Sequence, residues 1–274
     1  MRILETKKRK NIMLTSQKEK KICNQYLNQG FVVENIVDLK SLDWIRNTYC
    51  KIIKSFIPAI KNKDSNYILN NIHKNISISE LNNFRLKIIN KINSNKEFKE
   101  NFYKISKPLL DVVAGNELAM QKRISLSIQL PKDDSSLLPV HADTWTGVSA
   151  FETVIWLPLV NCYKSKSMFI LPANKTQSIK KIFSNNKIKS SSDIFKKIKK
   201  DLIWLKVNYG QIVVFDHSLP HGNIINNEKE TRWSMNCRFK GIFTPYADKR
   251  LGEYYEPITL KPTSKRGISY KLPK

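Results

Sequence analysis

The sequence predicts a mainly β fold with flanking α-helices, in which antiparallel strands form a barrel. Apolar residues in the first part of the chain recur with the spacing of amphipathic helices. From Arg123 onward, polar and apolar residues alternate instead with the period of two that is typical of strands. Residue types that bind metals stand on two segments far apart in the sequence, as expected at the mouth of a barrel.

Two helices are predicted in the first part. Residues 42–60 place Trp44, Ile45, Tyr49 and Ile52 at i, i+3 and i+4 spacing, and residues 81–92 continue this character after a break rich in Ser and Asn. We expect both helices to pack outside a sheet.

The second part is predicted to contain strands. In residues 123–130, Ser125, Ser127 and Gln129 share one polar face, which indicates a lined cavity and makes Gln129 a candidate cofactor contact. Further strands are predicted over 151–159, 167–171, 202–207, 211–215 and 233–241, with a lysine-rich helical insert over 179–200. Several antiparallel strands of this kind favour a double-stranded β-helix, the cupin-like jelly roll.

We divide the chain into three regions of one structural domain. A helical region over residues 1–118 is expected to pack on the barrel, whose core spans 119–245. Residues 246–274 are expected to form an extended, Pro-containing tail.

A metal site is the main functional prediction. His141 and Asp143 lie two residues apart in a predicted strand, so both can reach one ion while Ala142 faces away. A lone His-x-Asp tripeptide is a weak signal, but an apolar strand over 209–215 leads into a turn that carries more imidazole. Two imidazoles and one carboxylate on one face of a metal form the ligand set of non-haem Fe(II) enzymes, which leave positions open for a co-substrate and O2.

His217 and His221 compete for the third ligand position. We favour His221 because Pro220 and Gly222 fix a turn around it and because Arg232 follows at a short spacing. His217 is then expected near the rim, as a donor to a metal ligand or as a substrate contact. The alternative for either residue is a histidine satisfied by water or a backbone carbonyl, which is our interpretation of His73.

Arg232 is predicted to bind an anion. Alternation places Arg232, Ser234, Asn236 and Arg238 on one face of the last predicted strand. A guanidinium can bind a carboxylate through two parallel hydrogen bonds, and the Ser234 hydroxyl can donate a third, which suits a small dicarboxylate. The alternative is an arginine paired with an acidic side chain at a sheet edge.

The order of these motifs resembles a known family. His141-Ala142-Asp143, a strand ending at residues 156–159, Pro220-His221-Gly222 and Arg232-Trp233-Ser234 are similar to the 2-oxoglutarate- and Fe(II)-dependent dioxygenases, specifically their phytanoyl-CoA hydroxylase-like branch. Within that branch, residues 138–172 resemble oxygenases from bacterial carbohydrate and surface-polysaccharide clusters. The resemblance covers roughly residues 130–241.

The resemblance implies a reaction and a set of site residues. His141, Asp143 and His221 would hold Fe(II), and Arg232 with Ser234 would bind the distal carboxylate of 2-oxoglutarate. Trp156 and Asn223 would line the cofactor pocket. The implied reaction uses O2 to decarboxylate 2-oxoglutarate to succinate and CO2 and hydroxylates a small molecule such as a sugar, a sugar nucleotide or a polysaccharide precursor.

Two further segments compare with the family. Residues 27–33 look like the short opening strand that precedes a helix in these enzymes, whereas residues 172–175 depart from the family's usual motif and leave the substrate contacts of that loop in doubt. Our candidates for the substrate rim are Thr144, Trp145, Lys166, His217 and Arg238. Lys166 and Arg238 would suit an anionic group, unless they are ordinary surface charges.

Composition limits the other possibilities. The net charge of +25 suggests a nucleic-acid partner, but the lysines are spread along the whole chain and no basic patch is interleaved with aromatic residues. We therefore expect a small-molecule substrate instead, such as an anionic molecule or a carbohydrate. The four cysteines lack metal-site or disulfide spacing, which favours reduced thiols in the cytoplasm. No apolar run could span a membrane, and no apolar stretch follows the basic residues 7–10 as in a secretory signal.

Other function classes remain open at this point. A cupin-like isomerase or a metal-dependent hydrolase could use the same three ligands on a similar barrel, but neither needs the anion clamp at Arg232 and Ser234. A non-catalytic metal-binding barrel is a further alternative. The sequence leaves the substrate and the oligomeric state undetermined.

Overall fold

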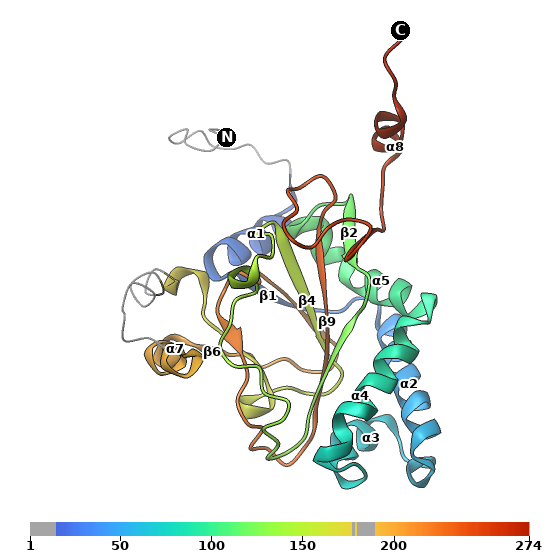
Figure 1. Cartoon of the computed structure of the whole chain (residues 1–274), viewed down its shortest axis with the longest axis vertical. Coiled ribbons are helices and arrows are strands. Elements are labelled where there is room, and N and C mark those ends of the chain that lie inside the picture. Colours follow the sequence, from blue (N-terminus) through green and yellow to red (C-terminus); the bar gives the residue numbers. More distant parts are fainter. Residues whose placement is uncertain (1–14, 177–178, 180–189, 274) are drawn as a thin grey trace.

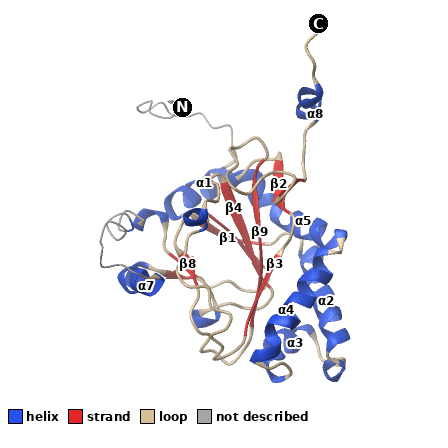
Figure 2. Ribbon diagram, viewed as in Figure 1, coloured by secondary structure: helices blue, strands red, loops and turns tan. Residues whose placement is uncertain are grey.

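The computed structural model describes residues 15–176, 179 and 190–273. Two sheets of unequal size form its centre. Helices α2, α3 and α4 lie together on one side of the strands, and α7 lies on the other (Figure 1). The prediction of a mainly β fold with flanking helices and a jelly-roll barrel is therefore confirmed (Figure 2).

The helices of the first part are more numerous than predicted. They are α1 (Gln17–Gln29), α2 (Leu39–Phe56), α3 (Ser65–Asn71), α4 (Ile78–Asn93) and α5 (Lys96–Val113), with 3-10 turns η1 (Pro58–Ile60) and η2 (Ile72–Lys74). Side chains of Ser16, Asp38, Asp64 and Asn95 accept backbone N–H bonds at helix starts. The helix predicted over 42–60 ends at Phe56, because Pro58 cannot continue it.

The opening strand begins later than predicted. Residues 27–29 form the last turn of α1, and Gly30 ends that helix in the left-handed conformation at φ 77°. Strand β1 (Phe31–Asn35) follows and leads into α2, so the predicted strand is wrong only in its first residues.

The larger sheet carries one wall of the barrel. Its order is β1-β7-β4-β9-β2-β10, and β3 also pairs with β9. The members are β2 (Leu118–Gln121), β3 (Ser125–Gln129), β4 (Glu152–Pro158), β7 (Gln211–Phe215), β9 (Arg232–Gly241) and β10 (Tyr255–Pro257). All its pairs are antiparallel, and the register sets Ser127 opposite Ser234 and Gln129 opposite Arg232.

The smaller sheet contains one of the predicted metal-ligand positions, His221. It has the order β6-β5-β8, formed by β6 (Ile203–Trp204), β5 (Phe169–Ile170) and β8 (His221–Gly222). The strands predicted over 167–171 and 202–207 are therefore present but shorter. The strand inferred around residues 138–144 is wrong in part: His141 forms one antiparallel bridge with His221, and Asp143 already begins the 3-10 turn η3 (Asp143–Thr146).

Two connections in the second part are short 3-10 turns, η4 (Lys164–Lys166) and η5 (Ala173–Lys175). The lysine-rich insert is helical where it is described, in α7 (Ser191–Ile198) followed by η6 (Lys199–Asp201). Residues 180–189 of that prediction lie outside the described part of the chain.

The region after residue 245 differs from the expected extended tail. Strand β10 pairs with β2, and Tyr255 is completely buried with its hydroxyl bonded to Glu152. Helix α8 (Pro262–Ser269) then stands off from the body of the molecule (Figure 1). The sequence signal for β10 was weak because a strand of three residues shows almost no period.

One large cluster of buried apolar side chains joins the helices to the larger sheet. It runs from Ile22 in α1 to Phe239 in β9. The cysteines at 23, 50, 162 and 237 are all free thiols. Among the described residues, no helix combines the length and the apolar character needed to cross a membrane.

Candidate functional site

Backbone bonds bring the three predicted metal ligands together. His141 and His221 exchange two bonds, from His141 N to His221 O at 3.1 Å and from His221 N to His141 O at 2.9 Å. Asp143 N donates to His217 O at 3.0 Å, so both turns are tied to each other. One ligand atom from each of His141, Asp143 and His221 lies within 4.8 Å of the others.

Both imidazoles are held in the tautomer that a metal ligand needs. His141 Nδ1 lies 2.8 Å from the carbonyl of Pro139, and His221 Nδ1 lies 2.8 Å from the carbonyl of Leu219. Because a carbonyl can only accept, each Nδ1 carries a proton, which leaves Nε2 as the atom of each ring that can bind a metal. The donor set is therefore two imidazole Nε2 atoms and a carboxylate, which fits a divalent transition metal.

His221 is also held neutral by its surroundings. Burial, helped by the nearby His141, lowers the pKa of His221 to about 4. At neutral pH no proton then has to leave His221 before a metal binds.

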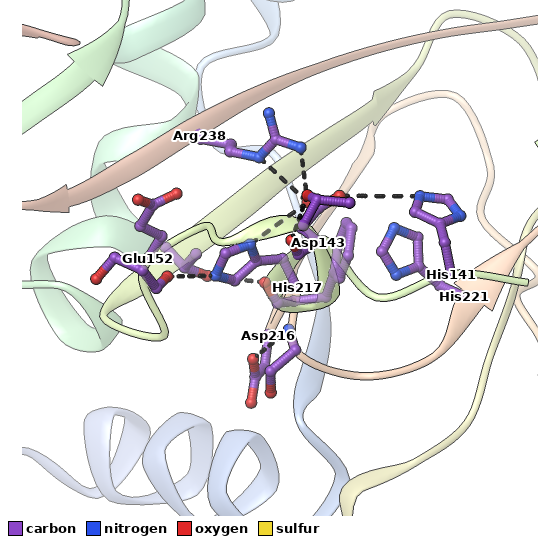
Figure 3. Close-up of polar contacts among 12 residues, drawn as sticks. His141, Asp143, Glu152, Asp216, His217, His221 and Arg238 are labelled. Carbon is purple, nitrogen blue, oxygen red and sulfur yellow. Dashed lines mark hydrogen bonds and ion pairs between the residues drawn. The ribbon is translucent and has the colours of Figure 1, made fainter. Parts of the chain in front are cut away.

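The two oxygens of Asp143 have different neighbours. His141 Nε2 lies 3.8 Å from Oδ1, whereas Arg238 Nη2 and Nε lie 2.7 and 3.1 Å from Oδ2. The imidazoles therefore stand on one side of the carboxylate and Arg238 on the other (Figure 3). Burial opposes ionisation of Asp143, but the neighbouring His217 and the charge of Arg238 outweigh it and hold the pKa of Asp143 well below its usual range.

His217 lies beside the Asp143 carboxylate and is not itself in the ligand cluster. Its ring is completely buried, Nε2 donates to Ser149 O at 2.9 Å, and Nδ1 lies 3.4 Å from Asp143 Oδ2 (Figure 3). The structure thus places His217 beside a candidate ligand, and it is absent from the residues lining the cavity described next.

A cavity of about 520 Å³ opens in front of the three ligands. Its walls include the inner faces of two paired strands, with Ser125 and Ser127 from β3 and Arg232, Ser234, Asn236 and Arg238 from β9. The polar side chains that alternate along these two strands therefore line a cavity, as the sequence predicted. The volume of this cavity is ordinary for a small-molecule site.

Arg232 is the unusual residue of this cavity. It is 2% exposed, and its guanidinium donates to Ser167 O at 3.2 Å and to Ser127 Oγ at 2.8 Å. Its Nε has no hydrogen-bond partner, and no carboxylate of the described residues forms an ion pair with it. Burial lowers the pKa of Arg232 to about 10, so it stays charged, and a buried charge without a counter-ion is a site for an anion.

The other cofactor-contact candidates separate into two groups. Trp156 and Asn223 line the cavity, and Asn223 Oδ1 accepts from Leu138 N at 2.7 Å. Gln129 does not line it: the side chain is fully buried, and Nε2 donates to Ile224 O at 2.6 Å.

Among the rim candidates, only Arg238 lines the cavity, and its guanidinium is already bonded to Asp143. Thr144 and Trp145 lie in η3 beside the site without lining it. Lys166 points elsewhere, because it is completely buried and its Nζ bonds Glu230 at 2.7 Å and Asn70 at 2.8 Å. His73, set aside in the sequence, bonds the hydroxyl of Thr231 through Nδ1 at 2.9 Å and also bonds the backbone of Asn70.

Arg85 lines the cavity and was not found from the sequence. It lies in α4, and no motif surrounds it, so only the packing of α4 on β3 shows that it reaches the site.

The comparisons support the fold. No family model and no curated protein matches the sequence. The solved structure of a nickel complex of ThoJ, described as a non-heme monooxygenase, superposes with a TM-score of 0.56 at 12% identity, over 89% of this chain and 85% of that chain. AviO1 from Streptomyces viridochromogenes Tue57 gives 0.52 at 12% identity, over 85% of this chain and 99% of that chain. SnoK is described as a non-heme alpha ketoglutarate dependent carbocyclase from nogalamycin biosynthesis. It superposes with a TM-score of 0.51 at 12% identity, over 90% of this chain and 97% of that chain. At such identities the likeness shows a common fold.

Proposed function

We propose that this protein is an Fe(II)- and 2-oxoglutarate-dependent oxygenase that acts on a small molecule. The observation that carries the proposal is the pairing, in one cavity, of a two-histidine, one-carboxylate cluster with the buried, uncompensated guanidinium of Arg232. A barrel that binds only a metal does not need a buried arginine, and burial of an unpaired charge lowers the stability of the folded protein.

His141, Asp143 and His221 are proposed to hold the metal. The chemistry that bound Fe(II) would supply is the O2-dependent decarboxylation of 2-oxoglutarate to succinate and CO2, coupled to oxidation of the substrate. The protein orients the ligands through the carbonyls of Pro139 and Leu219 and through the bonds to Asp143 Oδ2.

Arg232 and Ser234 are proposed to bind the distal carboxylate of 2-oxoglutarate. Both side chains line the cavity from the same face of β9, and Ser127, which is opposite Ser234, already orients the Arg232 guanidinium. Trp156 and Asn223 would contact the same co-substrate. SnoK, an alpha ketoglutarate dependent carbocyclase of similar fold, supports this use of the cavity.

The finer assignment remains the one drawn from the sequence. We propose that the protein belongs to the phytanoyl-CoA hydroxylase-like branch of these oxygenases. We also propose that it hydroxylates a sugar, a sugar nucleotide or a polysaccharide precursor. The polar wall formed by Ser125, Ser127 and Asn236 supports a hydroxylated substrate.

Calorimetry with Mn(II) in place of Fe(II) tests the proposal. We expect 2-oxoglutarate to bind wild-type protein only after Mn(II). His221→Ala should lose Mn(II), whereas Arg232→Met should keep Mn(II) and lose 2-oxoglutarate. His73→Ala is the matched control, because His73 bonds Thr231 and does not line the cavity, and it should change neither titration. Binding of Mn(II) without any binding of 2-oxoglutarate would favour a cupin-like isomerase or hydrolase instead.

A further inference from the structure

We infer that Arg85 binds an oxyanion of the primary substrate, so that the substrate is a small anionic molecule carrying a carboxylate or phosphate group. This inference rests on the proposed function, because it assigns the part of the cavity that 2-oxoglutarate would leave free.

Arg85 reaches the cavity from a helix that is fixed to the cavity wall. Asn93 at the end of α4 accepts from Ile124 N at 2.7 Å and donates to Ile124 O at 3.0 Å, immediately before β3. This pair of bonds holds α4 against the strand that carries Ser125 and Ser127, both of which line the cavity together with Arg85. The position of Arg85 is therefore set by the fold and not by a free loop.

The guanidinium of Arg85 lacks a counter-ion. Its Nη2 donates to the neutral amide of Asn82 at 2.7 Å, and its Nε is buried without a partner. Within the described part of the chain, no carboxylate forms an ion pair with it. A guanidinium that is oriented by an amide but not neutralised keeps donors available for an incoming oxyanion.

The charges of the cavity add a second, independent argument. Its charged lining residues are Arg85, Arg232, Arg238 and Asp143. Arg238 is neutralised by Asp143, and the charges of Fe(II) and of the 2-oxoglutarate dianion cancel each other. The charges of Arg85 and Arg232 then remain in the loaded site. An anionic substrate would be drawn into such a cavity, whereas a cation would be repelled.

No neighbouring acid changes this balance. Asp133 is bonded to Ser135 and Ser136, which line the cavity, but Asp133 itself is completely buried and is absent from the lining. Its carboxylate already accepts from Ser135 N at 2.8 Å and from Ser136 Oγ at 3.0 Å. Asp133 thus holds the loop that carries Ser135 and Ser136, and no ion pair joins Asp133 to Arg85.

The test titrates two simple anions into protein saturated with Mn(II) and 2-oxoglutarate, so that Arg232 is already occupied. Inorganic phosphate and acetate are used separately in calorimetry. We expect wild-type protein to bind at least one of them, and Arg85→Gln to bind it about tenfold more weakly or not at all. Binding of phosphate alone would indicate a phosphorylated substrate, and binding of acetate alone a carboxylic acid.

Two further variants separate a direct contact from a change in folding. Arg123→Gln is the matched control, because Arg123 Nη2 also bonds an asparagine amide, that of Asn90 at 2.7 Å, but Arg123 does not line the cavity. It should bind the anion as wild type does. Asn82→Ala keeps the charge of Arg85 but removes its anchor, so its affinity should lie between those of wild type and Arg85→Gln.

The inference is overturned if wild type binds neither anion, or if Arg85→Gln binds as tightly as wild type. A failure of the proposed function is recognised separately, by the absence of Mn(II) or 2-oxoglutarate binding. In that event the same comparison is made in metal-free Arg232→Met protein, with and without Arg85→Gln. Equal affinities there would again overturn the role of Arg85.

Discussion

The guanidinium of Arg238 bonds only one of the two carboxylate oxygens of Asp143. Nη2 and Nε both approach Oδ2, at 2.7 and 3.1 Å, while Oδ1 faces His141. Arg238 itself is anchored by Tyr254, whose hydroxyl lies 2.6 Å from Nη1. This arrangement keeps Asp143 ionised and leaves Oδ1 without a bond to Arg238, and the Arg238 guanidinium is already occupied by Asp143 and Tyr254.

Replacing Arg238 should therefore weaken metal binding without removing a ligand. We expect Arg238→Met to lower the Mn(II) affinity by about tenfold at neutral pH, as is usual for residues that orient a metal ligand. Because the pKa of Asp143 would rise, the loss should grow as the pH falls. Calorimetry between pH 5 and 7.5 checks this, with Arg123→Met as the exposed control. An unchanged affinity across that range would contradict the role given to Arg238.

The metal-free protein should lose stability as the pH falls from 6.5 to about 4. The pKa of His221 is depressed by burial, so in this window the unfolded chain binds a proton that the folded chain does not. The free energy of unfolding then decreases with falling pH, by roughly 3 kcal/mol across the window for this one group. The pKa of Asp143 is also lowered in the folded protein. Asp143 therefore adds a further decrease in the free energy of unfolding, at pH values below the range where a free carboxyl titrates.

Urea unfolding at a series of pH values measures this dependence. The matched variant is His221→Gln, which removes the titrating ring and should flatten the curve between pH 6.5 and 4. Equal slopes for wild type and His221→Gln would mean that His221 is not held neutral in the folded protein.

Arg232 should reduce stability in the absence of its anion. The two bonds from its guanidinium to Ser167 and Ser127 do not offset the burial of a full charge. We expect metal-free Arg232→Met to melt at the same or a higher temperature than wild type, and to lose affinity for 2-oxoglutarate on the order of 100-fold. Differential scanning fluorimetry with and without Mn(II) and 2-oxoglutarate tests both parts; a variant that melts much lower yet is still stabilised by 2-oxoglutarate would refute the assignment.

Tyr255 should contribute to the stability of the barrel. Its ring is completely buried, and its hydroxyl donates to Oε2 of Glu152, whose Oε1 has no hydrogen-bond partner. Tyr255→Phe leaves that buried carboxylate without a donor and should cost about 1–3 kcal/mol in the free energy of unfolding. Tyr270, which is 65% exposed in the region after α8, offers the control: Tyr270→Phe should be neutral in the same urea experiment.

The ligands of the site could be predicted because their signals are local. Alternation in β9 placed Arg232 and Ser234 on one face, and the turn around His221 distinguished it from His217. The strand argument for His141 and Asp143 was wrong in its geometry, since a bridge and a 3-10 turn bring them together. The spacing nevertheless identified two residues that lie beside His221, because one ligand atom from each of the three lies within 4.8 Å of the others.

The remaining features depend on contacts between distant segments. Arg85 reaches the cavity only because α4 packs on β3, and Lys166 is withdrawn from it because Glu230 and Asn70 bind its Nζ. Arg238 was likewise predicted to contact the substrate, but its guanidinium bonds Asp143 and Tyr254. Pattern and spacing identify which face of a strand a residue occupies, but not which partner it meets there.

The most direct test of the central claim is an anaerobic titration of Fe(II) into the protein with 2-oxoglutarate present. The chelated complex should give a weak visible charge-transfer band in wild type. His221→Ala and Arg232→Met should lose or weaken the band, the first through the metal and the second through the keto acid, and His73→Ala should keep it. If wild type binds Fe(II) and 2-oxoglutarate produces no band, the cavity does not hold the two together and the oxygenase assignment is wrong.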